Sequence, residues 1–328
     1  MKLPTNLAGI ARLILSPNNN CKSIVILTGA GVSVASGIPD FRSPGGMYAT
    51  LRPELITATP EERRLMRSDP TYVVEKEMFT RNQFPYLEVR RPFILGTRDR
   101  RWKATLAHRF AELLHVKTGK LTRVYTQNID GLYGQCDEIP SEKIVSVHGT
   151  IGKASCEACG FEADYDQFCH EVKHSIKDIY NTGDEDAPSA SKNINCRSCG
   201  KPAVKPTTVL FGGAMPEEFF ERVTEDLPSV DLLIVAGTSL VVAPANAIVF
   251  SVPEKAIRLI VNNEEVGHSL GIDYSETAKR DYFAKGMCDE VFLDLMCELG
   301  WLSDLSEIVD ELPEASRLLV NDRLAKSS

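Results

Sequence analysis

The chain has 328 residues, of which 43% are hydrophobic and 25% charged, and these ordinary globular proportions exclude a disordered or fibrous protein. Its 37 basic and 45 acidic residues give a net charge of −8, which argues against a protein that holds nucleic acid through its overall field. No apolar run approaches the roughly 20 residues of a membrane span. The nine cysteines, only four of them in C-x-x-C pairs, suit a reducing compartment. We therefore expect a cytoplasmic protein, with the nucleus also open, and neither a membrane nor a specific nucleic acid sequence as partner.

An amphipathic helix is predicted over residues 5–16, before an apolar, β-branched run that is typical of a buried parallel strand. Similar runs recur along the chain, with helical stretches at 103–117 and 216–225 between some of them. This repetition of strand, glycine turn and helix predicts an α/β fold with a doubly wound, Rossmann-like parallel sheet. The predicted strands are 23–27, 121–126, 144–147, 230–236 and 256–261.

Two stretches interrupt this alternation and predict a second, smaller domain. Residues 50–101 are polar and arginine-rich, and we interpret them as a helical insertion whose arginines form a solvated face, in preference to a patch for an anionic partner. Residues 151–206 contain both C-x-x-C pairs, a pattern that predicts a zinc-binding module, and the polar segment at 183–189 between the pairs is expected to be a mobile loop. The large, Rossmann-like domain then comprises 1–49, 102–150 and 207–313, and a polar tail comprises 314–328.

The two C-x-x-C pairs predict the metal site. Their four thiolates fill the coordination sphere of one tetrahedral zinc ion, which makes the ion structural and not catalytic. His170 and His174 are expected to be solvated, because four sulfur ligands already suffice. Redox dithiols would not explain why there are two pairs, and the acidic balance disfavours a DNA-binding zinc ribbon. The predicted ligands are Cys156, Cys159, Cys196 and Cys199.

The first predicted strand leads into the turn Gly29-Ala30-Gly31, a type of turn that holds phosphate groups at the start of a helix. Gly29 and Gly31 match the first two glycines of the dinucleotide-binding fingerprint, but Val34 stands in place of the third. An ordinary dehydrogenase is therefore disfavoured. A tight turn without a ligand remains an alternative at this point.

Residues 29–43, GAGVSVASGIPDFRS, resemble the signature of the sirtuins, the NAD-dependent protein deacylases, and the likeness is to class I. The resemblance covers about residues 22–50 and 103–301. It continues through TQNIDGL at 126–132, HG at 148–149, both C-x-x-C pairs, KP at 205–206, FG at 211–212, GTSL at 237–240, VN at 261–262 and CD at 288–289.

The resemblance implies roles around a bent NAD molecule. Ile38 and Asp40 would border the nicotinamide, Phe41 would shield the reacting ribose from water, and Arg42 would order the phosphate side. His148 would take a proton from a ribose hydroxyl, although a lone histidine at a strand end is more often structural. The catalytic residues implied are His148 and Asn128.

The other NAD contacts are implied at the carboxyl ends of predicted strands, where ligands bind in open α/β sheets. An Asx turn is a credible alternative for Asp130 alone, and residues 262–264 fit an adenine-ribose site and a plain polar turn equally well. The NAD-binding residues implied are Gly29, Ala30, Gly31, Val32, Ser33, Val34, Ile38, Asp40, Phe41, Arg42, Gln127, Asn128, Ile129, Asp130, Gly237, Thr238, Ser239, Asn262, Asn263, Glu264 and Cys288.

A substrate site is implied at Val209, Phe211 and Gly212, where an extended stretch would pair with an acyl-lysine peptide by strand addition. Thr207 and Gly213 depart from the Asp and Glu that are usual in the family, which leaves the preferred peptide open. The stretch at 89–93 lacks the Tyr-x-x-Arg pair of the desuccinylase branch, so neutral acyl groups are favoured.

We therefore expect an NAD-dependent protein-lysine deacetylase that transfers the acyl group from lysine to ADP-ribose and releases nicotinamide. It would use NAD and carry one structural zinc ion, and its partners would be acyl-lysine proteins, histone or non-histone. Two alternatives stay open. One is mono-ADP-ribosyl transfer to a protein, and the other is a module that binds NAD or acyl-lysine without turnover.

Overall fold

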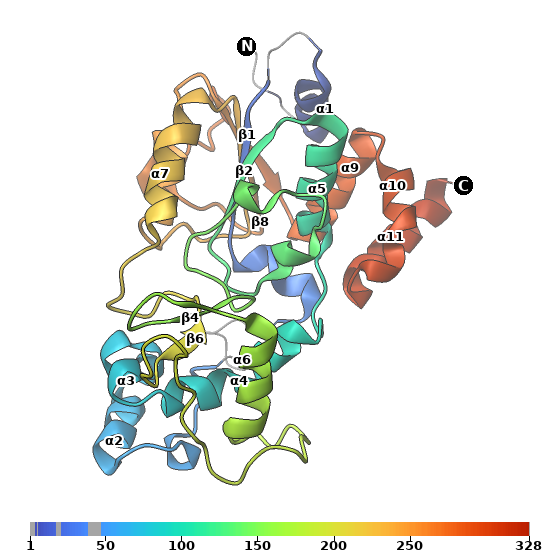
Figure 1. Ribbon diagram of the computed structural model, residues 1–328. Helices are drawn as coiled ribbons and strands as arrows, with labels where there is room; N and C mark the ends of the chain where they lie inside the picture. Colours follow the sequence, from blue (N-terminus) through green and yellow to red (C-terminus); the bar gives the residue numbers. More distant parts are fainter. Residues whose placement is uncertain (1–3, 5, 18–20, 39–46, 328) are drawn as a thin grey trace.

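The computed structural model describes residues 4, 6–17, 21–38 and 47–327. These residues form two parts, a larger one built on a six-stranded sheet and a smaller one that combines a three-stranded sheet with helices (Figure 1). Among the helices of the described ranges, none is both long and apolar enough to cross a lipid bilayer.

The neighbouring strands of the six-stranded sheet are all parallel, in the order β3-β2-β1-β7-β8-β9. The five strands predicted from apolar runs are present, which confirms the predicted α/β sheet. The sequence does not predict β9, because this edge strand is only partly buried and has no continuous apolar run. The strands are β1 (Ile24–Thr28), β2 (Leu121–Thr126), β3 (Ile144–Ser146), β7 (Leu232–Ala236), β8 (Ile257–Asn262) and β9 (Asp281–Lys285).

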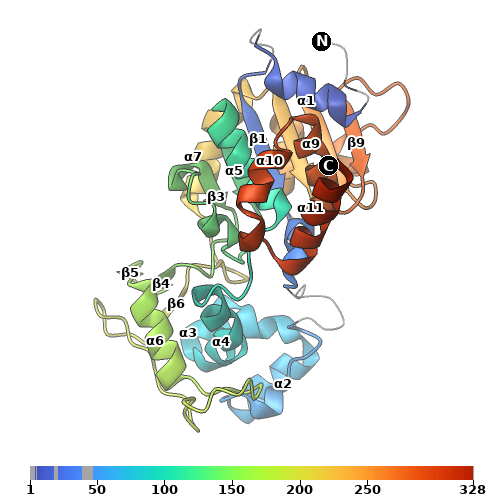
Figure 2. The same cartoon turned by 90° about the vertical axis from the view of Figure 1, so that its right-hand side faces the viewer.

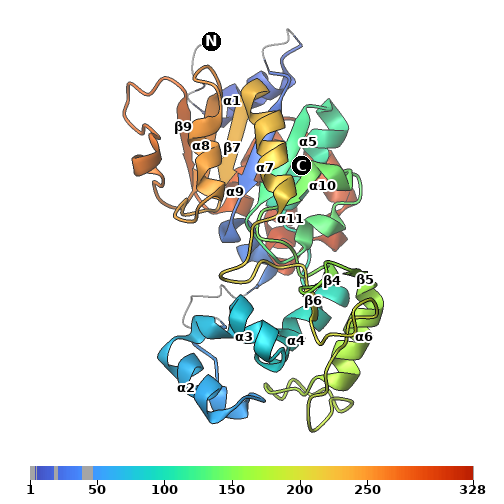
Figure 3. The same ribbon diagram turned by 60° about the vertical axis from the view of Figure 1, so that its left-hand side comes forward.

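Successive residues of the central strands face opposite layers of helices. Ile24 and Ile26 of β1 pack with α1, α5 and α9 on one face (Figure 2), whereas Val25 and Leu27 pack with α7 and α8 on the other (Figure 3). Because both faces are covered, β1 is buried along its whole length, and its residues from Ile24 to Leu27 are all apolar. The helices of this part are α1 (Leu7–Leu15), α5 (Leu106–Thr118), α7 (Glu217–Asp226), α8 (Ile248–Ser251), α9 (Cys288–Glu298), α10 (Leu302–Glu307) and α11 (Glu314–Ser327).

The order of the strands fixes where a ligand is expected. The chain leaves β1 for β2 and β3 on one side and later returns to β7, which lies on the other side of β1. The loops after β1 and β7 therefore begin side by side and diverge, which creates the topological switch point of an open α/β sheet. Ligands bind at the carboxyl edge of such a sheet at this point.

The smaller part is made from two insertions that share one apolar core. Its sheet has the antiparallel order β5-β4-β6, and helices α4 and α6 pack against each other beside it (Figure 1). The first insertion is helical, as its composition indicates. The elements are α2 (Pro60–Ser68), α3 (Lys76–Arg81), α4 (Phe84–Arg98), β4 (Ala154–Cys156), β5 (Glu162–Ala163), α6 (Tyr165–Ser175) and β6 (Val204–Pro206).

The interpretation of the arginines as one solvated face is wrong for Arg90 and Arg91, which are both buried on α4. The Arg91 guanidinium donates to Ile176 O at 2.8 Å and forms an ion pair with Asp184 at 2.6 Å. It is buried because it satisfies these groups of the second insertion, and a composition count cannot show such a partner. Asp184 belongs to the 183–189 segment, which Arg91 therefore ties to α4.

Residues 314–327, which composition marks only as a polar tail, form helix α11. Val320 of this helix is buried in the core beside α9, and the Ser316 hydroxyl donates to the carboxylate of Asp289 at the start of α9. That carboxylate also accepts from the backbone N–H groups of Leu106 and Ala107 in the first turn of α5. A single buried carboxylate therefore joins α5, α9 and α11.

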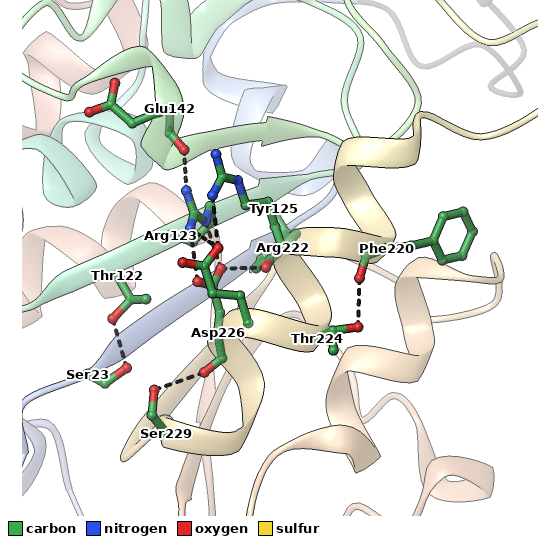
Figure 4. Close-up of polar contacts among 11 residues, drawn as sticks. Ser23, Thr122, Arg123, Tyr125, Glu142, Phe220, Arg222, Thr224, Asp226 and Ser229 are labelled. Atoms are coloured by element: carbon green, nitrogen blue, oxygen red, sulfur yellow. Dashed lines mark hydrogen bonds and ion pairs between the residues drawn. The ribbon is translucent and has the colours of Figure 1, made fainter.

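A buried ion pair joins α7 to the sheet (Figure 4). The Arg123 guanidinium on β2 holds both oxygens of Asp226, at 2.6 and 2.9 Å, and also donates to Glu142 O. The Tyr125 hydroxyl donates to the same carboxylate at 2.6 Å. Burial, and then this bond to Asp226, raise the pKa of Tyr125 above its ordinary value. The group is structural, because it ties the end of α7 and the residue Glu142 before β3 to the strand β2.

Candidate functional site

The loops after β1 and β7 touch backbone to backbone at the carboxyl edge of the sheet, on the side that faces the smaller part (Figure 1). The Gly31 N–H donates to Gly237 O at 2.8 Å. A Cβ atom on Gly31 would lie 2.6 Å from the Gly237 Cα, and one on Gly29 would lie 2.6 Å from the Thr238 Cβ. Glycine is therefore required here by the contact between two protein loops, and not only by the approach of a phosphate.

The polar residues after β2 bridge the same two loops. Gln127 Nε2 donates to Thr238 Oγ1 at 2.9 Å. Asn128 Nδ2 donates to Gly29 O at 3.0 Å and to Ser33 Oγ at 3.1 Å. Both amide hydrogens of Asn128 are thus used, which leaves its Oδ1 atom as an acceptor for a ligand. The three segments that follow β1, β2 and β7 are held together as one polar edge.

Asp130 is buried beneath this edge and contacts protein groups through both of its oxygens. Its Oδ2 atom accepts from Ser33 Oγ at 2.6 Å, and its Oδ1 atom accepts from the Leu132 N–H at 3.0 Å. The second bond is the Asx turn that the sequence left open. Burial raises the pKa of Asp130 above its ordinary value. Asp130 therefore orients Ser33, which in turn holds the Asn128 amide.

His148 follows β3 and is partly buried at the same edge of the sheet. Its Nδ1 atom lies 2.9 Å from Gln127 O, and because a carbonyl oxygen only accepts, Nδ1 must carry the proton. In the neutral ring, the Nε2 atom is then an unprotonated acceptor. The bond to Gln127 therefore fixes the tautomer that a general base requires.

The next residue, Gly149, joins His148 to the smaller part. Its φ is +72°, and a Cβ atom here would lie 2.0 Å from Thr207 O. Thr207 Oγ1 donates to Thr150 O at 3.1 Å and so holds this loop. The ring of His148 is thus held by Gln127 O, and the loop that follows His148 is held by Thr207.

The expected substrate segment runs from Val209 to Gly212. The Val209 N–H donates to His148 O at 2.9 Å, which places the segment beside the histidine. Phe211 uses its N–H to donate to Val74 O at 3.0 Å and its carbonyl to accept from the Lys76 N–H at 2.9 Å. Residues of the first insertion therefore use both backbone hydrogen-bonding groups of Phe211. The Phe211 ring, which is 49% exposed, is what this residue offers to a ligand.

The strands β7 and β8 supply the far side of the edge. Thr238 is buried, and its hydroxyl oxygen accepts a hydrogen bond from the Gln127 amide. Asn262 Nδ2 donates to Thr238 O at 3.3 Å. Ser239, Asn263 and Glu264 are exposed beyond them. The last of the expected NAD-binding positions, at the start of α9, is buried, and burial raises the pKa of Cys288 to about 12. Its thiol is a packed group and not a reactive one.

Helix η1 (Ala30–Ser36) follows the glycine turn, with Val32 buried beneath it and Val34 exposed. Thr105 is a residue of this site that the motifs do not indicate, and its buried hydroxyl donates to Val32 O at 2.7 Å and so holds η1 in place. Its position directly before α5, as a helix N-cap, is the sequence feature that could have revealed it. The expected cofactor residues Asp40, Phe41 and Arg42 lie outside the described residues.

The predicted cysteines come together as one site. The sulfur atoms of Cys156, Cys159, Cys196 and Cys199 lie within 4.8 Å of one another. The sulfurs of Cys156 and Cys199, and those of Cys159 and Cys196, are 3.7 Å apart. Zinc–sulfur bonds of about 2.3 Å give a tetrahedron with edges of about 3.8 Å, so these thiolates fit one zinc ion. The two histidines of α6, His170 and His174, are exposed as predicted and stand apart from this cluster.

A family model described as the Sir2 family matches residues 29–244. NAD-dependent protein deacetylase sirtuin-2 of Danio rerio is 33% identical over 317 residues, which are 92% of this chain and 74% of that protein. The chain belongs to the Sir2 family. It is also 33% identical to NAD-dependent protein deacetylase sir-2.1 of Caenorhabditis elegans and to sirtuin-1 of Homo sapiens. It covers 39% and 35% of those longer proteins, which match 85% and 88% of this chain.

The matched segment of this Sir2-family chain contains the glycine turn, the polar residues after β2, His148, the four cysteines and the substrate segment. The residues present fit the cofactor that the relatives' names imply. The switch point carries three glycines, Gly29, Gly31 and Gly237, at which a Cβ atom would clash, and exposed polar groups follow β7 and β8 on one side of it. His148 lies on the other side, with its Nδ1 atom bound to Gln127 O and no hydrogen bond from its Nε2 atom to the described residues. The Sir2 family also explains why a dehydrogenase fingerprint is absent after β1.

Proposed function

We propose that this Sir2-family protein is an NAD-dependent protein-lysine deacetylase. Its substrates would be acyl-lysine proteins, and the products would be free lysine, nicotinamide and an acylated ADP-ribose. The observation that carries the proposal is the His148 ring, whose Nδ1–H bond to Gln127 O makes Nε2 the acceptor atom of the neutral imidazole. The backbone oxygen of the same residue accepts from the Val209 N–H of the expected substrate segment. The relatives named above carry the same activity in their names.

Bound NAD would supply the ADP-ribosyl group that accepts the acyl oxygen as the bond to nicotinamide breaks. The residues proposed to hold it are those of the glycine turn and η1, residues 127–130, Gly237-Thr238-Ser239, residues 262–264 and the backbone at Cys288. His148 Nε2 takes the proton of a ribose hydroxyl, which makes that oxygen nucleophilic toward the acyl carbon. Asn128 Oδ1 orients a polar group of the ligand, because both of its amide hydrogens are bound to protein.

Val209 and the exposed ring of Phe211 are proposed to line the stem of the acyl-lysine, and Gly212 to contact its backbone. The scheme needs no cysteine nucleophile. The buried Cys288 thiol is held protonated, and the four clustered cysteines are the proposed zinc ligands. The zinc ion would hold the smaller part together, because four sulfur ligands leave no position open for substrate.

The test is to incubate the purified protein with NAD and an acetyl-lysine peptide and to analyse the products by mass spectrometry. Deacetylated peptide, nicotinamide and acetylated ADP-ribose should form in equal amounts. Replacing His148 by alanine should lower turnover by about 100-fold or more, while NAD binding measured by calorimetry changes little. His170→Ala, at an exposed position on α6, is the matched control.

Two outcomes would contradict the proposal. Normal turnover by the His148→Ala variant would show that the base has been assigned wrongly. ADP-ribose attached to a protein, with the peptide still acetylated, would establish mono-ADP-ribosyl transfer instead.

A further inference from the structure

Glu157 lies between the first two cysteines of the metal site, and its carboxylate binds two lysines that come from different parts of the chain. Its Oε2 atom is 3.1 Å from Lys205 Nζ, and its Oε1 atom is 3.2 Å from Lys76 Nζ. Its backbone N–H donates to Ala203 O at 2.8 Å. The Glu157 side chain is 21% exposed and that of Lys205 only 3%, so water screens the first pair little.

Lys205 connects Glu157 to Thr208, the residue directly before the substrate segment. Its ammonium group donates to Thr208 O at 2.6 Å, to Pro206 O at 3.0 Å and to Glu157, so all three of its hydrogens are used. The peptide unit between Thr208 and Val209 is planar, and its other end, the Val209 N–H, donates to His148 O. Lys205 and His148 therefore fix the two ends of one rigid peptide unit.

Lys76 reaches the other end of the same segment. Its backbone N–H donates to Phe211 O at 2.9 Å, while its side chain pairs with Glu157. Glu157 directly follows the metal-site residue Cys156 in the chain. Through the two lysines, its carboxylate thus supports both Thr208 and Phe211. No other ion pair among the described residues links the segment between two zinc-site cysteines to these two positions.

We propose that Glu157 is a positioning residue that makes the binding of acyl-lysine substrate depend on the four-cysteine site. When the four thiolates are held together by a metal ion, the loop at 156–159 places the carboxylate where it orients Lys205 and Lys76. These lysines then hold Thr208–Phe211 in the conformation that receives the substrate. The inference rests on the proposed function, because it takes this segment as the acyl-lysine site.

The variant Glu157→Gln keeps the shape of the side chain and removes its charge. Peptide affinity is measured by fluorescence anisotropy with a labelled acetyl-lysine peptide, alongside the KM for peptide, the KM for NAD, kcat and the zinc content. Loss of a charge-assisted contact to a buried lysine should weaken peptide binding and raise the KM for peptide by about tenfold. The KM for NAD and kcat should change less than about twofold.

The matched control is Glu162→Gln, an exposed glutamate on β5 of the same module without an ion pair in the described chain. It should leave all five quantities unchanged. A second variant, Lys205→Met, removes the middle of the connection without changing the cysteine loop. It should raise the KM for peptide as Glu157→Gln does, with zinc content still one per chain.

The outcomes separate this inference from the proposed function. If the unaltered protein does not deacetylate the peptide, the proposed function fails. If it does, and Glu157→Gln binds peptide normally, the positioning role is refuted. It is equally refuted if the KM for NAD rises by the same factor, because the effect is then a general loss of structure. Should Glu157→Gln lose its zinc, Lys205→Met decides, and a normal KM for peptide in that variant overturns the inference.

Discussion

His108 on α5 allows the pH dependence of stability to be worked out for a single residue. Its side chain is completely buried against the ring of Tyr133, with the ring centroids 4.6 Å apart. The Nδ1 atom accepts from the Thr105 N–H at 3.2 Å, and the Nε2 atom has no partner among the described groups. Burial, with a smaller contribution from the charge of Arg109, lowers the pKa of His108 to about 3.

The sign of the effect follows from where the proton binds. In the unfolded chain the imidazole has its ordinary pKa of 6.5, so it takes up a proton below that pH while the folded protein does not. Stability is therefore complete above pH 6.5 and is lost progressively as the pH falls toward 3. Between pH 7 and pH 5 this one residue should cost about 2 kcal/mol of unfolding free energy.

The variant His108→Gln tests this value without removing the helix cap. Glutamine at the third helical position is the usual partner of an N-cap threonine, so it can replace the bond to the Thr105 N–H. The free energy of unfolding is measured in urea at pH 7 and at pH 5. Between these two pH values it should fall by about 2 kcal/mol less in the variant than in the unaltered protein. Equal losses for the two proteins would mean that His108 is protonated in the folded state or reached by water.

Three further changes test other parts of the structure. Gly149→Ala should lower the free energy of unfolding by at least about 2 kcal/mol and abolish turnover, because its Cβ atom would meet Thr207 O. The control Gly134→Ala, which has open space around it, should be tolerated. Equal losses of stability in the two variants would contradict this reasoning. Asp226→Asn should cost about 3 kcal/mol in urea unfolding by leaving Arg123 without its ionic partner, and a cost below about 1 kcal/mol would refute a buried pair. Removing zinc with a chelator should lower the melting temperature and abolish peptide binding, both restored by adding zinc back, whereas an unchanged melting curve would exclude a structural ion.

The sequence predicts the central sheet because burial of a strand on both faces requires a run of apolar residues within the strand itself. A strand covered on both faces is mostly apolar, as β7 shows along its whole length and β1 shows from Ile24 to Leu27. Strand β9 escapes prediction because it is an edge strand whose residues are only partly buried. Arg91 escapes it for a different reason, since its burial depends on Asp184 and the Ile176 carbonyl, which lie far along the chain.

The candidate site shows the same division. The residue types of the site can be listed from motifs, and the cysteines meet as their spacing predicts. The tautomer of His148 depends on a carbonyl 21 residues away, and the need for Gly31 depends on a loop that follows another strand. These are contacts between segments that only the folded chain brings together. The chemical groups of the site can therefore be identified from the sequence, whereas their orientation requires the tertiary structure.

The core shared by the two insertions constrains how this chain can be recombined with its relatives. Arg91 and Glu88 of the first insertion bind Asp184 and Ser191 of the second, and α4 packs on α6. A chimaera that exchanges only one insertion would leave buried charges facing foreign side chains and half of an apolar core without its counterpart. The pair must be exchanged as a unit, although about fifty residues of the larger part separate the two in the sequence.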